Sequence, residues 1–133
     1  MAELKLKKAR LTKAEQFKKE DEHKPLGRHI IADFFGSKNI DDPDYIEKAL
    51  RDAAAASGAT VLGYKFHRFS PQGVTGYLLL AESHISIHTW PEHGYAAIDV
   101  FTCGDMDPRP AFLLMKERFD SSSFKTVEIM RGF

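Results

Sequence analysis

The feature that most limits the fold is residues 74–102, where three strand-like segments follow one another with only short breaks. These segments, Val74 to Ala81, Ile85 to Trp90 and Tyr95 to Thr102, are rich in β-branched and aromatic residues. A parallel connection needs a crossover of a dozen or more residues, and neither break is long enough for one. The sequence therefore predicts an antiparallel arrangement in this part of a sheet.

Two further segments have the termini and spacing of helices. Asp42 followed by Pro43 is typical of a helix start, and Gly58 is a natural end for that helix. Asp107 followed by Pro108 predicts a second helix start. The apolar side of the second helix is expected to contain Phe112, Leu113, Met115 and Phe119.

Strands are also expected over residues 28–35, 60–69 and 124–130. The order along the chain is then strand, helix, four strands, helix, strand. Two helices can cover only one face of such a sheet. We predict an α+β fold, with a mostly antiparallel sheet and helices on one face. A second subunit is the simplest way to cover the other face.

Length and charge favour one domain without an evident nucleic-acid or membrane partner. The chain has 133 residues, and Lys and Arg together number 19, as do Asp and Glu. We expect a charged N-terminal tail over residues 1–25 and a single domain over residues 26–133. Zero net charge favours self-association over binding to nucleic acid or anionic membrane. A single cysteine, Cys103, and the lack of an apolar leader or membrane-spanning run indicate a cytoplasmic protein.

Polar residues concentrate between Thr75 and Cys103, and a metal site is one interpretation of them. On a strand, His84 and His88 would lie about 13 Å apart at 3.3 Å per residue. Zinc holds its histidine nitrogens at about 2 Å, so these two side chains could not share one ion. We therefore expect no metal.

A Ser or Cys hydrolase with a histidine and an aspartate is a second interpretation. The residue types are present, but there is no Gly-x-Ser-x-Gly elbow. Neither Ser83 nor Cys103 opens an evident helix directly after a strand. An isolated serine or histidine on a strand is usually an ordinary polar side chain, so this interpretation is weak as well.

Three strings of sequence support a third interpretation. Residues 78–105 read LLLAESHISIHTWPEHGYAAIDVFTCGD, which resembles the signature of prokaryotic S-adenosylmethionine decarboxylases. LGRHIIADFFG, residues 26–36, and FSPQGVTG, residues 69–76, resemble the same pyruvoyl-dependent family. The resemblance extends from Leu26 to about Pro110, and it implies a proenzyme.

The resemblance implies that the chain cuts itself between Glu82 and Ser83. The products would be a β chain, residues 1–82, and an α chain, residues 83–133, held together in one sheet. Attack by the Ser83 hydroxyl on the preceding carbonyl, elimination and hydrolysis would leave a pyruvoyl group as the only cofactor. Such a group forms a Schiff base with the substrate amine and accepts the electrons released with carbon dioxide.

Site residues follow from the same resemblance. His88 matches the family residue that moves protons during self-processing, and Cys103 matches the proton donor to the substrate carbon. Thr75 stands where the family has a serine that helps to hold the cleavage intermediate, and Phe69 falls near the substrate. Ser83 and His88 face opposite ways in a regular strand, so they could converge only through irregular backbone near Ser83.

S-adenosylmethionine is the expected substrate, decarboxylated for spermidine and other polyamine synthesis. The resemblance also implies a homodimer that stacks two sheets between outer helices, an αββα four-layer sandwich with active sites at the interface. Two alternatives stay open. The same scaffold could decarboxylate arginine or ornithine, or the chain could be a regulatory homologue that never processes.

Overall fold

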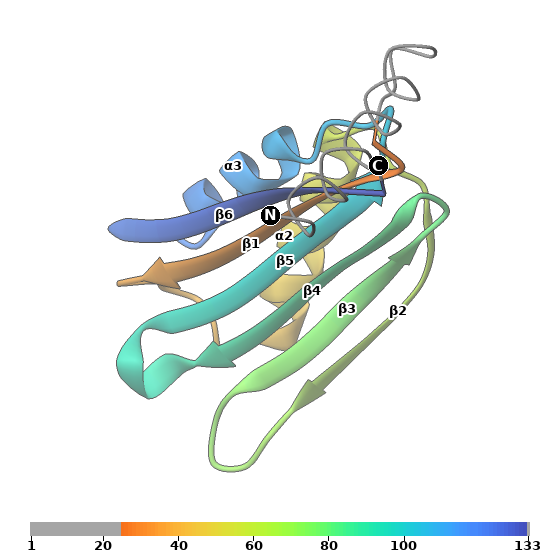
Figure 1. Cartoon of the computed structure of the whole chain (residues 1–133). Helices are drawn as coiled ribbons and strands as arrows, with labels where there is room; N and C mark the ends of the chain where they lie inside the picture. The colour runs from red at the N-terminus through yellow and green to blue at the C-terminus, as the bar shows by residue number, and fades with distance from the viewer. Residues whose placement is uncertain (1–24, 133) are drawn as a thin grey trace, which may run out of the picture.

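The computed structural model describes residues 25–132, which form one sheet and two α-helices (Figure 1). The expected tail therefore lies outside the described residues, apart from its last position. The strands are β1 (Gly27–Phe35), β2 (Val61–Arg68), β3 (Val74–Leu80), β4 (Ser83–Trp90), β5 (Tyr95–Cys103) and β6 (Ser123–Arg131). The helices are α2 (Pro43–Ala56), α3 (Arg109–Arg118) and the short 3₁₀ turn η1 (Pro91–His93).

The sheet is antiparallel throughout, in the order β2-β3-β4-β5-β1-β6. The predicted run of neighbouring strands is therefore confirmed for β2 to β5. The first strand of the domain, β1, inserts between β5 and β6, so that Ile31 pairs with Asp99 on one side and Val127 on the other. The predicted α+β class is confirmed.

Both helices lie on the same face of the sheet, as expected (Figure 1). The Asp42 carboxylate accepts a hydrogen bond from the Asp44 amide at 3.0 Å and caps the start of α2. After the end of α2, Gly58 adopts a left-handed conformation with φ 77°. Asp107 likewise accepts from the Arg109 amide at the start of α3. Neither described helix has the length and apolarity needed to cross a bilayer.

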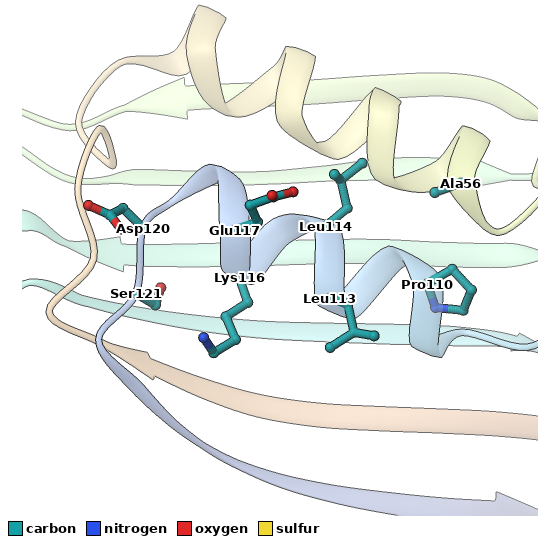
Figure 2. Close-up of a pocket in the computed structure, with 8 residues that line it drawn as sticks. All are labelled: Ala56, Pro110, Leu113, Leu114, Lys116, Glu117, Asp120 and Ser121. Carbon is teal, nitrogen blue, oxygen red and sulfur yellow. The ribbon is translucent and has the colours of Figure 1, made fainter.

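One residue of the expected apolar side of α3 was assigned wrongly. Leu113 is 58% exposed, whereas Phe112, Met115 and Phe119 are buried as expected. It faces outward on the side of α3 that points away from α2, and it contributes to a shallow surface depression lined mostly by residues of α3 (Figure 2). The apolar run around it is continuous, so the sequence pattern did not show which residues face the core.

The two faces of the sheet differ sharply. The covered face contributes buried apolar side chains to a single core with the helices. Its largest fully buried members from the strands are Phe34, Val74, Leu78, Ile85, Ile87 and Val100. The face without helices, which we call the open face, carries apolar side chains that are about half exposed. These are Ile31, Tyr77, Leu79, Trp90, Val127 and Ile129.

Candidate active site

The tight turn between β3 and β4 holds the bond singled out by the sequence. Ala81 and Glu82 form a two-residue turn, and Leu80 pairs with Ser83 on its other side. Ser83 has φ 145°, a backbone conformation that residues other than glycine rarely adopt. Such a conformation costs on the order of 1–3 kcal/mol and persists only where the surroundings impose it. The irregular backbone expected at Ser83 is confirmed.

Thr60, just before β2, fixes this turn from the side. Its carbonyl accepts a hydrogen bond from the Ala81 amide at 2.9 Å, and its own amide donates to the Glu82 carboxylate at 3.0 Å. Both bonds lie on the Glu82 side of the Glu82–Ser83 peptide. The carbonyl that Ser83 would attack is therefore part of a backbone segment held at two points.

Cys103 lies at the same end of the sheet as Ser83. His84 pairs with Phe101 across β4 and β5, which places Ser83 and Cys103 at adjoining ends of neighbouring strands. The thiol is exposed. The structure therefore brings together Glu82, Ser83 and Cys103, and we call this group the scissile end.

Thr75 and His88 form a second group further along the same two strands. They pair directly across β3 and β4, and the Thr75 hydroxyl lies 3.1 Å from His88 Nδ1. Phe69 lines the same surface cavity of about 280 Å³. Trp90 and Glu92 also line it. We call this group the Thr75–His88 pocket.

The two groups do not meet within one chain. Strand pairing is continuous from Leu80–Ser83 to Thr75–His88, without a bulge. Five residues along β4 correspond to about 16 Å at 3.3 Å per residue. The irregular backbone at Ser83 therefore does not bring His88 close to Ser83 within one chain.

A partly buried carboxylate between the two groups was not assigned a role from the sequence. Asp99 on β5 accepts hydrogen bonds from the Ser86 hydroxyl, from His29 Nε2 at 2.6 Å and from His84 Nε2 at 3.0 Å. Burial acts to raise the pKa of Asp99, but the hydrogen bonds from Ser86, His29 and His84 outweigh it and lower the pKa. Asp99 is therefore an ionised carboxylate with every oxygen engaged.

His84 connects this carboxylate to the scissile end. Its Nδ1 lies 3.4 Å from the Ser83 hydroxyl. The period of two along the strands could have placed His84 and Asp99 on one face, because each alternates with buried apolar residues. His29 could not have been found in this way, because nothing in the sequence places β1 beside β5.

The ligand atoms of His29, His84 and Asp99 lie within 4.8 Å of one another, and these are residue types that bind metals. The pair considered from the sequence as metal ligands was His84 with His88, which did not include His29 or Asp99. Binding of one divalent ion by both Nε2 atoms together with Asp99 would require these two nitrogens to give up their hydrogen bonds to Asp99. As they stand, the three side chains form a hydrogen-bonded network.

The model for the family described as S-adenosylmethionine decarboxylase matches residues 28–132. The chain belongs to the S-adenosylmethionine decarboxylase family. The match covers both groups of candidate residues and confirms the resemblance inferred from the sequence.

Relatives within the S-adenosylmethionine decarboxylase family are similar over most of their length. An S-adenosylmethionine decarboxylase proenzyme of Thermosipho melanesiensis is 49% identical over 112 residues, covering 82% of this chain and 86% of that protein. A proenzyme of the same name from Fervidobacterium nodosum is 50% identical, covering 82% of each chain. The crystal structure of adenosylmethionine decarboxylase from Aquifex aeolicus superposes with a TM-score of 0.78 at 38% identity, covering 84% of this chain and 94% of that one. The expectation that the chain is an enzyme of this family is confirmed.

Proposed function

We propose that the chain is a proenzyme that cuts itself between Glu82 and Ser83 and then decarboxylates S-adenosylmethionine. The observation that carries the proposal is the strained backbone of Ser83 directly after a tight turn, with Thr60 holding the Glu82 side. Relatives about half identical to the chain are named proenzymes, which supports a precursor that must be processed. We place this reaction in the cytoplasm.

The scissile end suits a pyruvoyl group made from Ser83. Its serine has both the nucleophile and the leaving group that such a conversion needs, and its backbone is held in place by the turn. When formed, a pyruvoyl group supplies an electron sink for decarboxylation. Cys103, exposed at the adjoining strand end, is positioned to return a proton to the substrate carbon. The product would donate aminopropyl groups in spermidine and other polyamine synthesis.

A homodimer would join the two separated groups. The open face carries half-exposed apolar side chains such as Leu79 and Val127, at 48% and 57% exposure, which favours burial against a second copy. A two-fold interface puts the same patch on both subunits, so the Thr75–His88 pocket of one copy can meet the scissile end of the other. There His88 would remove the Ser83 Cα proton during elimination. The Thr75 hydroxyl would hold the cleavage intermediate.

Phe69 supports S-adenosylmethionine as the substrate. Its ring is 47% exposed and lines the Thr75–His88 pocket, where an aromatic face can bind a sulfonium or an adenine. One observation favours arginine or ornithine instead, because Glu92 places a carboxylate in the same pocket. That carboxylate already accepts a hydrogen bond from Gln72 at 3.1 Å. S-adenosylmethionine therefore remains the better-supported substrate.

The direct test is denaturing mass spectrometry of the purified full chain, followed by carbon dioxide release from S-adenosylmethionine, arginine and ornithine. We expect two fragments, with a pyruvoyl group at the start of the 83–133 fragment. The Ser83→Ala variant should stay intact, because it has neither nucleophile nor leaving group. A wild-type chain that stays intact on prolonged incubation would indicate the non-processing homologue. A kcat/KM for arginine or ornithine tenfold higher than for S-adenosylmethionine would mean that one of these amino acids is the substrate instead.

Complementation tests whether two copies share each site. Ser83→Ala and His88→Ala variants should each remain uncut when expressed alone. In a mixed dimer, the His88→Ala subunit keeps Ser83 and meets an intact His88 on the other copy. We therefore expect the His88→Ala chain to be cut only on co-expression. Absence of cutting in verified mixed dimers would mean that each site is completed within one chain.

A further inference from the structure

His84 has no role in the proposed function so far, yet it is the only described histidine within hydrogen-bonding distance of the Ser83 hydroxyl. The geometry around Asp99 determines which of its nitrogens carries hydrogen. An ionised carboxylate can only accept, so His84 Nε2, 3.0 Å from Asp99 Oδ2, must be the donor. A neutral imidazole carries one hydrogen, which leaves His84 Nδ1 as an acceptor. That acceptor faces Ser83 Oγ at 3.4 Å.

His29 supports the same assignment independently. Its Nε2 also donates to Asp99, at 2.6 Å, and its Nδ1 lies 3.4 Å from a guanidinium nitrogen of Arg131. Arginine has no acceptor, so His29 Nδ1 must accept and His29 Nε2 must carry the hydrogen. Ser86 occupies the other Asp99 oxygen. The carboxylate is thus oriented by three donors, and it fixes the ring of His84 in turn.

We infer that His84, oriented by Asp99, is the base that takes the Ser83 hydroxyl proton in the first step of self-cleavage. The inference rests on the proposed self-processing and assigns it a further catalytic residue. Ser83 Oγ bonds to the Glu82 carbonyl carbon, and the bond from that carbon to the Ser83 nitrogen breaks. The proton passes from Oγ to His84 Nδ1 and then to the departing nitrogen, which becomes a free amine. An ester replaces the amide, and no other reactant is consumed.

This assignment divides the two histidines of β4 between two steps. His84 would act on the hydroxyl within its own chain, before the ester exists. His88, about 13 Å further along the strand than His84, would act from the second copy on the Cα proton, after the ester exists. His29 shares the Asp99 carboxylate, but its ring stacks on Phe101 with centroids 4.7 Å apart and makes no contact with Ser83.

Trapping of the ester distinguishes the two histidines. Hydroxylamine cleaves an ester but leaves an ordinary peptide bond intact. Full-length His88→Ala should accumulate the ester and be cut by hydroxylamine between residues 82 and 83. His84→Ala should keep the amide, resist hydroxylamine and self-cleave about 10²- to 10⁴-fold more slowly than wild type. Added imidazole should restore cleavage of His84→Ala, a rescue that a merely structural role would not give.

Two further variants guard against misfolding as an explanation. His84→Gln retains a hydrogen-bond donor for Asp99 but has no basic nitrogen, so it should fold and still fail to form the ester. Asp99→Asn should slow ester formation at least tenfold, because its amide can donate to His84 and hold the wrong tautomer. The exposed His93, in η1, provides a remote control, and His93→Ala should cleave at the wild-type rate.

His29→Ala is the matched control, since it removes an imidazole from the same carboxylate and leaves the contact between Ser83 and His84. It should cleave at least tenfold faster than His84→Ala. The inference is overturned if His84→Ala or His84→Gln forms the ester within threefold of the wild-type rate. It is also overturned if His29→Ala and His84→Ala fail alike and wild-type cleavage needs added zinc, which would indicate a metal site. A wild-type chain that never cleaves overturns the proposed function itself.

Discussion

The covered face and the open face of the sheet are built from alternate residues of the same strands, yet their chemistry is opposite. On β1, Ile30 and Phe34 are buried beneath the helices, whereas His29 and Asp33 on the other side hydrogen-bond to polar partners on β5. The covered face has one requirement, which is close apolar packing. The open face combines hydrogen-bonded polar groups with apolar side chains that are half exposed.

This difference indicates that the covered face mainly determines the stability of the fold, whereas the open face carries most of the groups proposed to react. A substitution on the covered face should change the free energy of unfolding and leave the reacting groups intact. A substitution on the open face should change processing, turnover or dimerisation and have less effect on the core. The following predictions test this separation.

The largest effect is expected for Leu50→Ala. Leu50 is fully buried in α2, and its truncation should destabilise the protein by about 2–5 kcal/mol. Leu79→Ala is the matched control on the open face, where the side chain is 48% exposed. Denaturant unfolding at several protein concentrations should show a loss independent of concentration for Leu50→Ala. Leu79→Ala should show a smaller loss that depends on concentration, and an equal loss for both would contradict the division between faces.

Cys103→Ala should separate processing from turnover. We expect it to be cut at the wild-type rate, because the thiol has no part in forming the ester. Decarboxylation should fall about a hundredfold or more, the usual contribution of a positioned general acid. Fragment formation by mass spectrometry and single-turnover carbon dioxide release measure the two steps separately. Near-normal turnover by the fully cut variant would remove Cys103 from the mechanism.

A smaller effect is expected for Phe69→Ala, which removes the aromatic wall of the Thr75–His88 pocket. Loss of a cation–π contact worth roughly 0.5–2 kcal/mol should raise the KM for S-adenosylmethionine about 2- to 30-fold, with little change in self-cleavage. Phe124 on β6 is similarly exposed and lies outside that pocket, so Phe124→Ala should leave KM unchanged. Equal effects of the two variants would argue against a substrate contact at Phe69.

The smallest effect concerns the pH dependence of stability. The pKa of Asp99 is lowered in the folded protein, so its contribution is fully present above the unfolded value of about 3.9. That contribution is lost as pH falls through the lower folded pKa. The difference in Tm between wild type and Asp99→Asn should therefore be larger at about pH 6 than at about pH 2.5. Ser86→Ala removes one of the lowering hydrogen bonds and should show a weaker pH dependence than wild type.

Local rules carried most of the fold prediction. The caps at Asp42 and Gly58 and the short breaks between β3, β4 and β5 act over a few residues, and the structure confirms them. The place of β1 depends on pairing between segments far apart in sequence, so no local pattern could give it. The same reason explains Leu113, whose exposure is decided by what packs against α3.

The candidate site shows the same limit. Ser83 and Cys103 were selected by resemblance, and the pairing of β4 with β5 places them at one end. The distance from Ser83 to His88 was expected to close through a bend in the chain, and the unbroken pairing of β3 with β4 keeps them apart. The Asp99 network combines side chains from β1, β4 and β5, so it becomes visible only once the strand order is known.

The insertion of β1 between β5 and β6 has a consequence for the life of the molecule after a cut at Glu82–Ser83. One fragment would supply β1, β2 and β3, and the other β4, β5 and β6, so that β1 of the first is flanked by two strands of the second. The fragments would be interleaved and could separate only by global unfolding. Refolding would then become a bimolecular reaction that depends on concentration. The chain folds as a single molecule before the cut. After the cut, the lifetime of the folded complex of the two fragments would be governed by its rate of unfolding.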